Sequence, residues 1–346
     1  MRKNTQVLPA LTSLRGLGAL WVLLFHLQPE SAWGPLKFGY LGVDLFFILS
    51  GFIISHVHAQ DFPVYRLKQH MHFLRLRLIR IYPLHVFVLL IFAVLVLSAE
   101  GFVSRYPNPE RFGFGHFLAS LLLVNNWGLG PPPLWNTPTW SLSAEWLAYI
   151  AFPFISIACQ RLLAPRYCLG LAFLTLGAMA ILLTLNGHPD LAGTGKAGLV
   201  RMLGGFIAGC LIAQYTSGKA PCHSATYALM TIACLLLASR FPDFPGLYLA
   251  AFVFVITAIA LKERNCLIGF LELKPLRLLG EISFSIYLCH WPIIQLRNWA
   301  LERGMIESEN TDIYVIAVTL LIATLCWRLI EVPSRKAGRK WIAAHP

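Results

Sequence analysis

Five ionisable side chains stand inside otherwise apolar runs of this chain: Arg15, His26, Asp44, Glu145 and His290. A charged side chain at the centre of a bilayer costs about 2.5 to 3.5 kcal/mol on insertion scales, so such residues usually pair with one another or carry function. Imidazole and carboxylate groups are common general bases, and guanidinium groups bind anionic groups. The residue types therefore predict an acid–base site buried within membrane-spanning elements.

Arg15 and His26 are predicted to share one face of the first apolar segment. They are eleven residues apart, and eleven residues of α-helix return to within about 20° of the starting direction while rising roughly 16 Å. The small residues Gly18 and Ala19 lie between them and leave space for a thin ligand. The alternative is helix packing through these small residues, with Arg15 extending toward the inner membrane surface.

Asp44 and Glu145 are expected at the same depth as His26, near the outer ends of their segments. They lie in the sequences GYLGVDLFFILSGFII and PTWSLSAEW. A carboxylate that accepts a hydrogen bond from an imidazole fixes its tautomer and raises its basicity. The sequence thus predicts His26 as a general base that is oriented by Asp44 or Glu145. A structural salt bridge between Asp44 and Arg15, or another buried charge, is the alternative interpretation.

Three further polar residues complete the candidate site. Ser141 precedes Glu145 by one helical turn, and Tyr287 and His290 share one helical face. We treat Ser141, Tyr287 and His290 as additional site candidates. A hydrogen-bonded core histidine is an equally good interpretation of His290.

Arg77 and Arg80 form an i, i+3 pair directly before Tyr82 and Pro83. Two arginines on one helical face can bind a phosphate group through bidentate hydrogen bonds. The pair is therefore a candidate for binding an anionic ligand. The commoner explanation of such a basic cluster is anchoring at the cytoplasmic membrane surface or contact with anionic lipids.

The composition indicates that lipid surrounds the elements that carry these residues. Of 346 residues, 57% are hydrophobic and 13% are charged, about half the charged share of an ordinary soluble domain. A spanning helix needs about 20 apolar residues, and ten segments meet this expectation: 8–28, 39–58, 81–99, 141–160, 167–186, 199–215, 225–239, 246–262, 280–297 and 312–330. We therefore predict an all-α polytopic membrane bundle of about ten transmembrane helices, formed as one domain over residues 1–346.

The distribution of basic residues predicts the orientation of the bundle. Cytoplasmic loops of membrane proteins are enriched in Lys and Arg. If the short segment 112–126 does not cross, most loop Lys and Arg residues are cytoplasmic, whereas Lys196 and Arg201 are among those outside. This orientation places both termini in the cytoplasm and the protein in the inner (cytoplasmic) membrane.

Two other classes of ligand are disfavoured. The formal net charge of +12 favours a nucleic-acid partner only where basic residues form a continuous face, and here apolar runs separate them. The eight cysteines show no Cys-x-x-Cys or Cys/His ligand spacing, which favours small core residues over metal ligands. We therefore expect neither nucleic acid nor a metal.

Six stretches, in order along the chain, resemble the motifs of the acyltransferase 3 family of membrane acyltransferases. They are LTSLRGLGALWVLLFH, GYLGVDLFFILSGFII, the Arg-x-x-Arg motif at residues 77–80, TWSLSAEW, GEISFSIYLCHWPI and IEVPSR. Thr12 stands where many members have Asp, and Trp146 replaces the second of two acids that often follow the W-S-L motif. Neither of these acids can contribute here.

The resemblance implies a membrane-embedded O-acyltransferase. Its donor would be cytoplasmic acyl-CoA, most often acetyl-CoA, and its acceptor a hydroxyl group of a surface glycan or a small molecule. Arg15, Arg77 and Arg80 would contact the donor, and His26 would be the catalytic base. A thioester is already activated, so the reaction needs no metal or redox cofactor. Some members carry a C-terminal soluble domain, which we do not expect because little sequence follows the last predicted span.

Two other functions fit the same residues. Intramembrane His, Asp and Glu residues also form the proton relays of transporters, so a proton-coupled transporter or flippase is the main alternative. A non-catalytic scaffold is disfavoured because it has no need for costly buried charge. Within the enzyme interpretation, a transient acyl-histidine at His26 is a variant of direct attack by the acceptor.

Overall fold

Helices make up the regular structure of this chain. The computed structural model describes residues 8–27, 34–99, 101–128, 134–219, 223–241, 243–307 and 309–344, and these ranges contain no β-strand. In chain order the helices are α1 (Pro9–Leu27), η1 (Gly34–Leu41), α2 (Gly42–His58), η2 (Ala59–Asp61), α3 (Leu67–Ser98), η3 (Pro109–Phe112), α4 (Phe114–Leu121), α5 (Thr139–Leu162), α6 (Pro165–Leu185), α7 (Lys196–Thr216), α8 (Ser224–Arg240), α9 (Gly246–Ala260), α10 (Cys266–Leu271), α11 (Lys274–Glu281), α12 (Ser283–Glu302), α13 (Thr311–Cys326), η4 (Trp327–Glu331) and α14 (Val332–Ala344).

Seven helical segments of the described chain are long and apolar enough to cross a membrane. They are Pro9–Leu27, Gly34–Asp61, Leu67–Ser98, Thr139–Arg161, Pro165–Leu185, Lys196–Thr216 and Thr311–Ala344. The predicted spans at 225–239 and 246–262 fall on α8 and α9, which are apolar but only 17 and 15 residues long. The span at 280–297 falls mainly on α12, whose second half carries Gln295, Arg297, Asn298 and Glu302. The predicted all-α polytopic membrane fold is confirmed.

The doubtful segment 112–126 forms only one short helix. α4 has eight residues, about 12 Å of helix against a hydrocarbon core of about 30 Å. The chain turns directly after it, where Leu123 has a φ of 57°. His85 Nε2 lies 2.9 Å from the Ser120 carbonyl oxygen and holds the end of α4 against α3. As a helix this segment is too short to cross.

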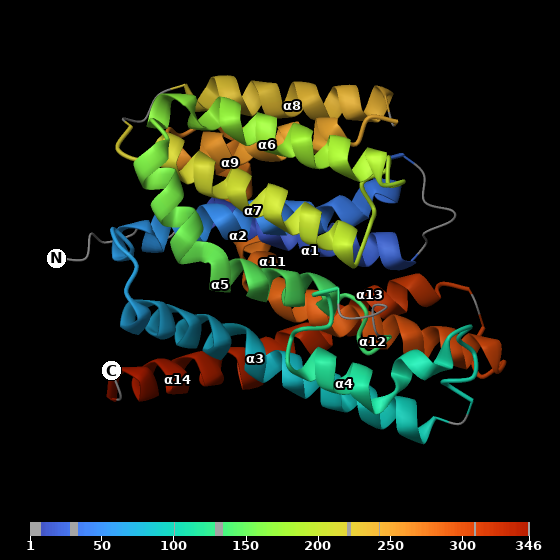
Figure 1. Ribbon diagram of the computed structural model, residues 1–346. Helices are drawn as coiled ribbons and strands as arrows, with labels where there is room; N and C mark the ends of the chain where they lie inside the picture. The colour runs from blue at the N-terminus through green and yellow to red at the C-terminus, as the bar shows by residue number, and fades with distance from the viewer. Residues whose placement is uncertain are drawn as a thin grey trace.

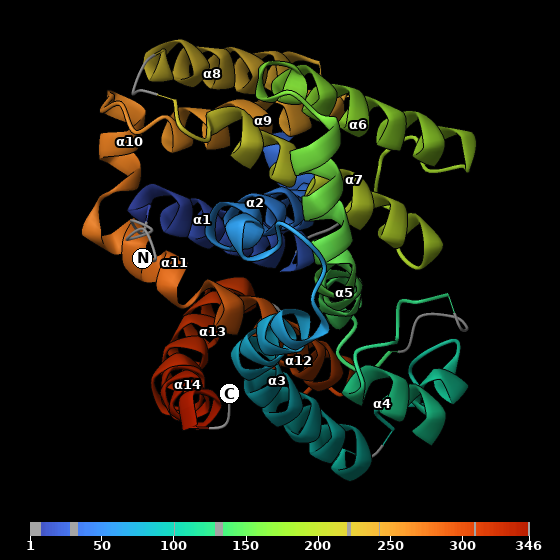
Figure 2. The same cartoon turned by 60° about the vertical axis from the view of Figure 1, so that its left-hand side comes forward.

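The long helices run alternately in opposite directions (Figures 1 and 2). α1 begins and α14 ends on the same side of the bundle, at the left in Figure 1. The connections from α2 to α3, α5 to α6 and α7 to α8 lie on that side too. These connections and the helix ends beside them carry Arg66, Lys68, Arg161, Arg166 and Lys219. The start of α1 and the end of α14 therefore share a side of the bundle with these basic residues.

Glycines allow two close backbone contacts that position the polar residues. At Gly209 of α7 a Cβ would lie 2.0 Å from the Ile48 carbonyl oxygen of α2, so these two helices pack backbone to backbone. At Gly280 of α11 a Cβ would lie 2.0 Å from the Thr12 carbonyl oxygen of α1. The second contact brings the start of α12 next to Arg15.

Candidate active site

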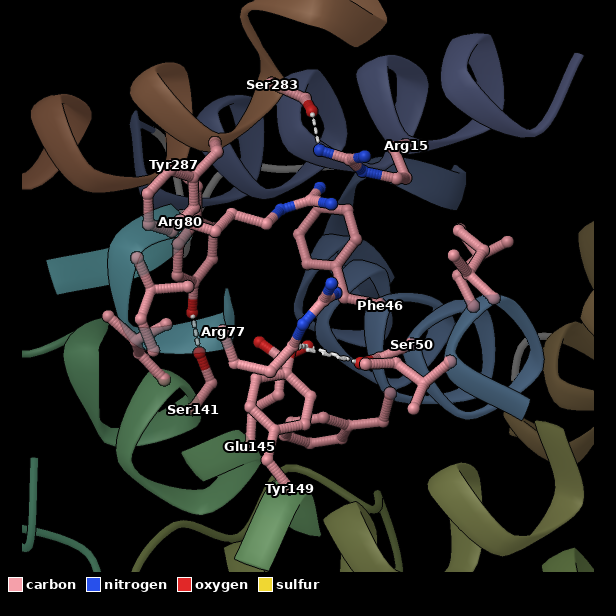
Figure 3. A pocket seen from close by; sticks show the side chains of 17 residues that line it. Arg15, Phe46, Ser50, Arg77, Arg80, Ser141, Glu145, Tyr149, Ser283 and Tyr287 are labelled. Atoms are coloured by element: carbon pink, nitrogen blue, oxygen red, sulfur yellow. Dashed lines mark hydrogen bonds between the residues drawn. The ribbon is translucent and has the colours of Figure 1, made fainter. Parts of the chain in front are cut away.

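A cavity of about 110 Å³ lies between α1, α2, α3, α5 and the start of α12 (Figure 3). Six of the predicted site residues line it, namely Arg15, Arg77, Arg80, Ser141, Glu145 and Tyr287. Ser50, Tyr149 and Ser283 add hydroxyl groups that were not among the predicted residues. The rest of the lining is apolar. The structure therefore brings together residues from five of the six sequence motifs.

The cavity carries an excess of positive charge. Figure 3 shows the guanidinium groups of Arg15, Arg77 and Arg80 directed into it, and Glu145 is the one carboxylate in its lining. In the part of the chain that the structure describes, none of these arginines forms an ion pair within 4.0 Å. Uncompensated charge in a low-dielectric interior is costly. The cavity is therefore suited to a ligand with anionic or strongly polar groups.

Glu145 and Arg15 are each held by hydroxyl groups. Glu145 Oε1 accepts hydrogen bonds from Ser50 Oγ, at 2.5 Å, and from the Tyr149 hydroxyl. Arg15 Nη2 donates to Ser283 Oγ over 3.2 Å. These hydrogen bonds fix the positions of Glu145 and Arg15. Because hydroxyl groups carry no charge, they leave the positive charge of Arg15 uncompensated. Arg77 Nε is buried and has no hydrogen-bond partner among the described residues, so its hydrogen-bonding capacity is unused.

His26 lies outside this cavity and pairs with another histidine. Its ring centroid is 5.2 Å from that of His290, and Tyr287, which lines the cavity, is 5.8 Å from His290. His26 Nδ1 is 2.9 Å from the Val22 carbonyl oxygen. A carbonyl only accepts, so this Nδ1 carries a hydrogen and Nε2 of the neutral ring keeps its lone pair. The geometry leaves His26 Nε2 able to act as a base.

His290 has the same arrangement deeper in the bundle. Its Nδ1 lies 3.2 Å from the Ile286 carbonyl oxygen, and its Nε2 is buried without a partner among the described residues. The side chain is fully buried. Two imidazoles thus lie side by side, one turn of α12 beyond the cavity wall at Tyr287.

The predicted orientation of His26 by a carboxylate is not what the structure shows. Asp44 instead makes a bidentate salt bridge to Arg201, with Nε to Oδ1 at 3.1 Å and Nη2 to Oδ2 at 2.6 Å. Both side chains are 1% exposed. Glu145 binds Ser50 and Tyr149. Similar depth in the membrane does not bring side chains together when their helices present them in different directions.

Arg201 was counted among the loop residues on the outer side of the membrane, whereas in the structure it is a buried residue of α7. α7 begins at Lys196, so Arg201 stands within its second turn and is fully buried. Besides Asp44 it donates to the carbonyl oxygens of Gly193, at 3.0 Å, and Tyr40, at 3.2 Å. Burying a carboxylate without a cationic partner is costly. Asp44 in an apolar segment, together with Arg201 near the start of a predicted span, is therefore the sequence signal that points to this pair.

A second, larger cavity opens on the side of the termini, and we call it the vestibule. Its volume is about 1500 Å³. Arg77 and Arg80 line both cavities and so form the boundary between them. Further cationic residues of its lining are Lys219, Lys262, Arg335 and Arg339. The polar interior of the bundle is therefore approached through a wide basic entrance.

Comparison with known proteins relates the chain to acyltransferases over nearly its whole length. A family model described as an acyltransferase domain matches residues 8–331. The O-acetyltransferase OatA of Staphylococcus aureus is 25% identical over 377 aligned positions, which cover 99% of this chain and 60% of the relative. The peptidoglycan O-acetyltransferase OatA of Listeria monocytogenes is 29% identical, over 97% of this chain and 57% of the relative. No solved structure gives a significant match.

Proposed function

Because this chain belongs to the acyltransferase 3 family, we propose that it is a membrane-embedded O-acyltransferase that moves an acyl group from acyl-CoA to a hydroxyl of a cell-surface glycan. One observation carries the proposal: an arginine-rich cavity and a basic vestibule lie next to each other and share Arg77 and Arg80 in their linings. The names of the relatives favour acetyl as the acyl group and peptidoglycan as the first acceptor to test. The chain spans about 60% of the length of these relatives.

The two cavities match the two parts of an acyl-CoA molecule. Its nucleotide carries several phosphate charges, and the vestibule of about 1500 Å³ exceeds the roughly 300 to 1,000 Å³ of ordinary ligand pockets. Its pantetheine arm is thinner than its nucleotide, and we assign it to the smaller cavity of about 110 Å³. In this arrangement Arg77 and Arg80 bind the pyrophosphate through charge-assisted hydrogen bonds. Arg15 lies further along the path of the arm.

The position of the donor sets the proposed orientation. CoA esters are cytoplasmic, so the vestibule and both ends of the described chain face the cytoplasm in an inner membrane. The basic loops on the vestibule side support this orientation through the positive-inside rule. His26, at the opposite end of α1, then faces the outer side, where glycan hydroxyls are available.

His26 is proposed to act as the general base. Its Nε2 takes the proton of the acceptor hydroxyl while the oxygen attacks the thioester carbonyl carbon. The C–S bond then breaks, and the leaving sulfur takes the proton back from the imidazolium, which gives an ester and free CoA. The acyl end must pass Ser141 and Tyr287, whose hydroxyl groups are 2.6 Å apart, to reach the imidazole pair.

Loss of either junction arginine is expected to weaken donor binding. Arg77→Ala and Arg80→Ala should each raise the KM for acetyl-CoA about tenfold, since a hydrogen bond to a charged group contributes about 1.5 to 3 kcal/mol. The double variant should be nearly inactive, and Lys replacements should be intermediate because Lys cannot bind in bidentate fashion. CoA thiol release by protein in lipid nanodiscs, with peptidoglycan fragments as acceptor, measures this.

Arg75→Ala is the matched control for the junction arginines. Arg75 lies on the same helix, is exposed and lines neither cavity. It should leave the KM for acetyl-CoA unchanged. An unchanged KM in both Arg77→Ala and Arg80→Ala would assign the pair to membrane anchoring and remove the main support for a CoA donor.

A further inference from the structure

The C-terminal helix α14 contributes a second arginine pair to the vestibule. Arg335 and Arg339 are one helical turn apart, and both line the vestibule together with Arg77 and Arg80. The vestibule therefore has two arginine pairs, one at its narrow junction and one on α14.

Close packing holds α14 against α3 at this point. A Cβ at Gly338 would lie 2.4 Å from Cγ2 of Ile79, so the absence of a side chain at Gly338 allows the two helices to touch. Gly338 lies between Arg335 and Arg339 in the sequence, and Ile79 directly precedes Arg80. The contact thus presents the α14 pair to the same cavity as Arg80.

The α14 pair keeps binding capacity for an anion. Arg335 Nη1 is 3.5 Å from Glu331 Oε1, and the other oxygen of Glu331 accepts a hydrogen bond from Ser285 Oγ at 3.0 Å. Arg339 is exposed and forms no ion pair within 4.0 Å in the described ranges. Asp61 is the one carboxylate in the vestibule lining, and it already accepts a hydrogen bond from His58.

We propose that Arg335 and Arg339 bind the 3′-phosphate of the CoA ribose, so that α14 selects CoA over nucleotides that lack this phosphate. The inference rests on the proposed function. CoA carries a pyrophosphate next to the pantetheine arm and a separate phosphomonoester on its ribose. Arg77 and Arg80 stand where the arm begins, which leaves the α14 pair for the outer phosphate. A phosphomonoester carries a charge of about −1.5 to −2 at neutral pH and is bound by arginine in bidentate fashion.

Donors that differ only in the 3′-phosphate test this assignment. In nanodiscs of zwitterionic lipid, the unaltered protein should show a kcat/KM for acetyl-CoA about 10- to 100-fold above that for 3′-dephospho-acetyl-CoA, mainly through KM. In Arg335→Ala/Arg339→Ala this preference should fall to about one, because the kcat/KM for acetyl-CoA falls to near that for the dephospho donor. Arg339→Ala alone, which removes no ion pair, should reduce the preference part of the way.

Lys336→Ala/Lys340→Ala is the matched control, because both lysines lie on α14, are exposed and do not line the vestibule. It should keep the full preference.

The inference is overturned if the arginine variants retain the preference or lose activity equally with both donors. It is also overturned if they alter activity only in nanodiscs containing anionic lipid, which would assign the pair to lipid phosphates. The difference in affinity between adenosine 3′,5′-bisphosphate and adenosine 5′-monophosphate tests the same assignment without turnover. If the protein does not transfer acyl groups, this binding measurement still tests the 3′-phosphate site separately from the proposed function.

Discussion

His26→Gln is expected to abolish acyl transfer, with kcat lowered about 10²- to 10⁴-fold and the KM for acetyl-CoA little changed. Glutamine has a similar size and can donate to the Val22 carbonyl oxygen, as His26 Nδ1 does at 2.9 Å. Its amide cannot take up a proton at working pH, so the acceptor hydroxyl loses its base. Single-turnover release of CoA thiol by purified protein separates this loss from any change in donor binding.

The controls for His26 use other histidines of the chain. His116→Gln lies on α4, outside both cavities, and should retain full activity. His290→Gln tests whether His290, the buried neighbour of His26, takes part in the chemistry or only in packing. If its role is only packing, the variant should lose less acyl-transfer activity than His26→Gln. A correctly inserted His26→Gln protein with near-normal transfer would falsify the base assignment and show that another group takes the proton.

Arg201→Ala and Asp44→Ala are each expected to destabilise the fold strongly. Both side chains are 1% exposed, so removing one leaves the other as an uncompensated buried charge, at a cost of roughly 3 to 5 kcal/mol. Thermal unfolding in detergent should show a large drop in midpoint for each single variant. Asp44→Leu/Arg201→Met removes both charges and should regain much of the loss, although the carbonyl groups of Gly193 and Tyr40 then lack a donor.

A surface ion pair provides the comparison for this buried pair. Arg105 Nη2 lies 3.3 Å from Glu302 Oε1, and Glu302 is 55% exposed, so Glu302→Ala should cost at most about 1 kcal/mol. Asp44→Ala could instead have the same unfolding midpoint as the unaltered protein and only a lowered kcat. That result would show that Asp44 acts in the chemistry and that our assignment of it to the salt bridge is wrong.

Apolar runs and residue spacing predicted the helices and part of the site. Arg15, Glu145 and the Arg77–Arg80 pair were each chosen because they interrupt an apolar segment or pair on a helical face, and they meet in one cavity. The position of a residue along its own helix predicts its depth in the membrane. That information is local, so it can be obtained from a single segment of sequence.

The partners of Asp44 and His26 could not be predicted in this way. Arg201 is 157 residues from Asp44, and their contact depends on how α2 packs against α7 through glycines such as Gly209. His26 meets His290 because α12 packs beside α1. These contacts depend on the relative rotation of whole helices, which a periodic pattern in one helix does not specify.

The vestibule also depends on contacts between distant segments. The IEVPSR stretch was predicted only as a family motif. In the structure it leads through the π-helical turn η4 into α14, and α14 then packs on α3 at Gly338 and Ile79. No feature of residues 67–98 alone indicates that a C-terminal helix forms one wall of the entrance to their arginine pair.

Transfer of a labelled acyl group by the purified protein tests the central claim most directly. The protein in nanodiscs is incubated with acetyl-CoA that carries an isotope label in the acetyl group, with peptidoglycan fragments as acceptor. Mass spectrometry follows the acceptor while a thiol reagent follows free CoA. We predict a base-labile labelled ester on the acceptor, formed in equal amount to the CoA released, and neither product with His26→Gln. Folded protein that releases no CoA and forms no ester, with peptidoglycan fragments or a wider panel of glycans, would contradict the account.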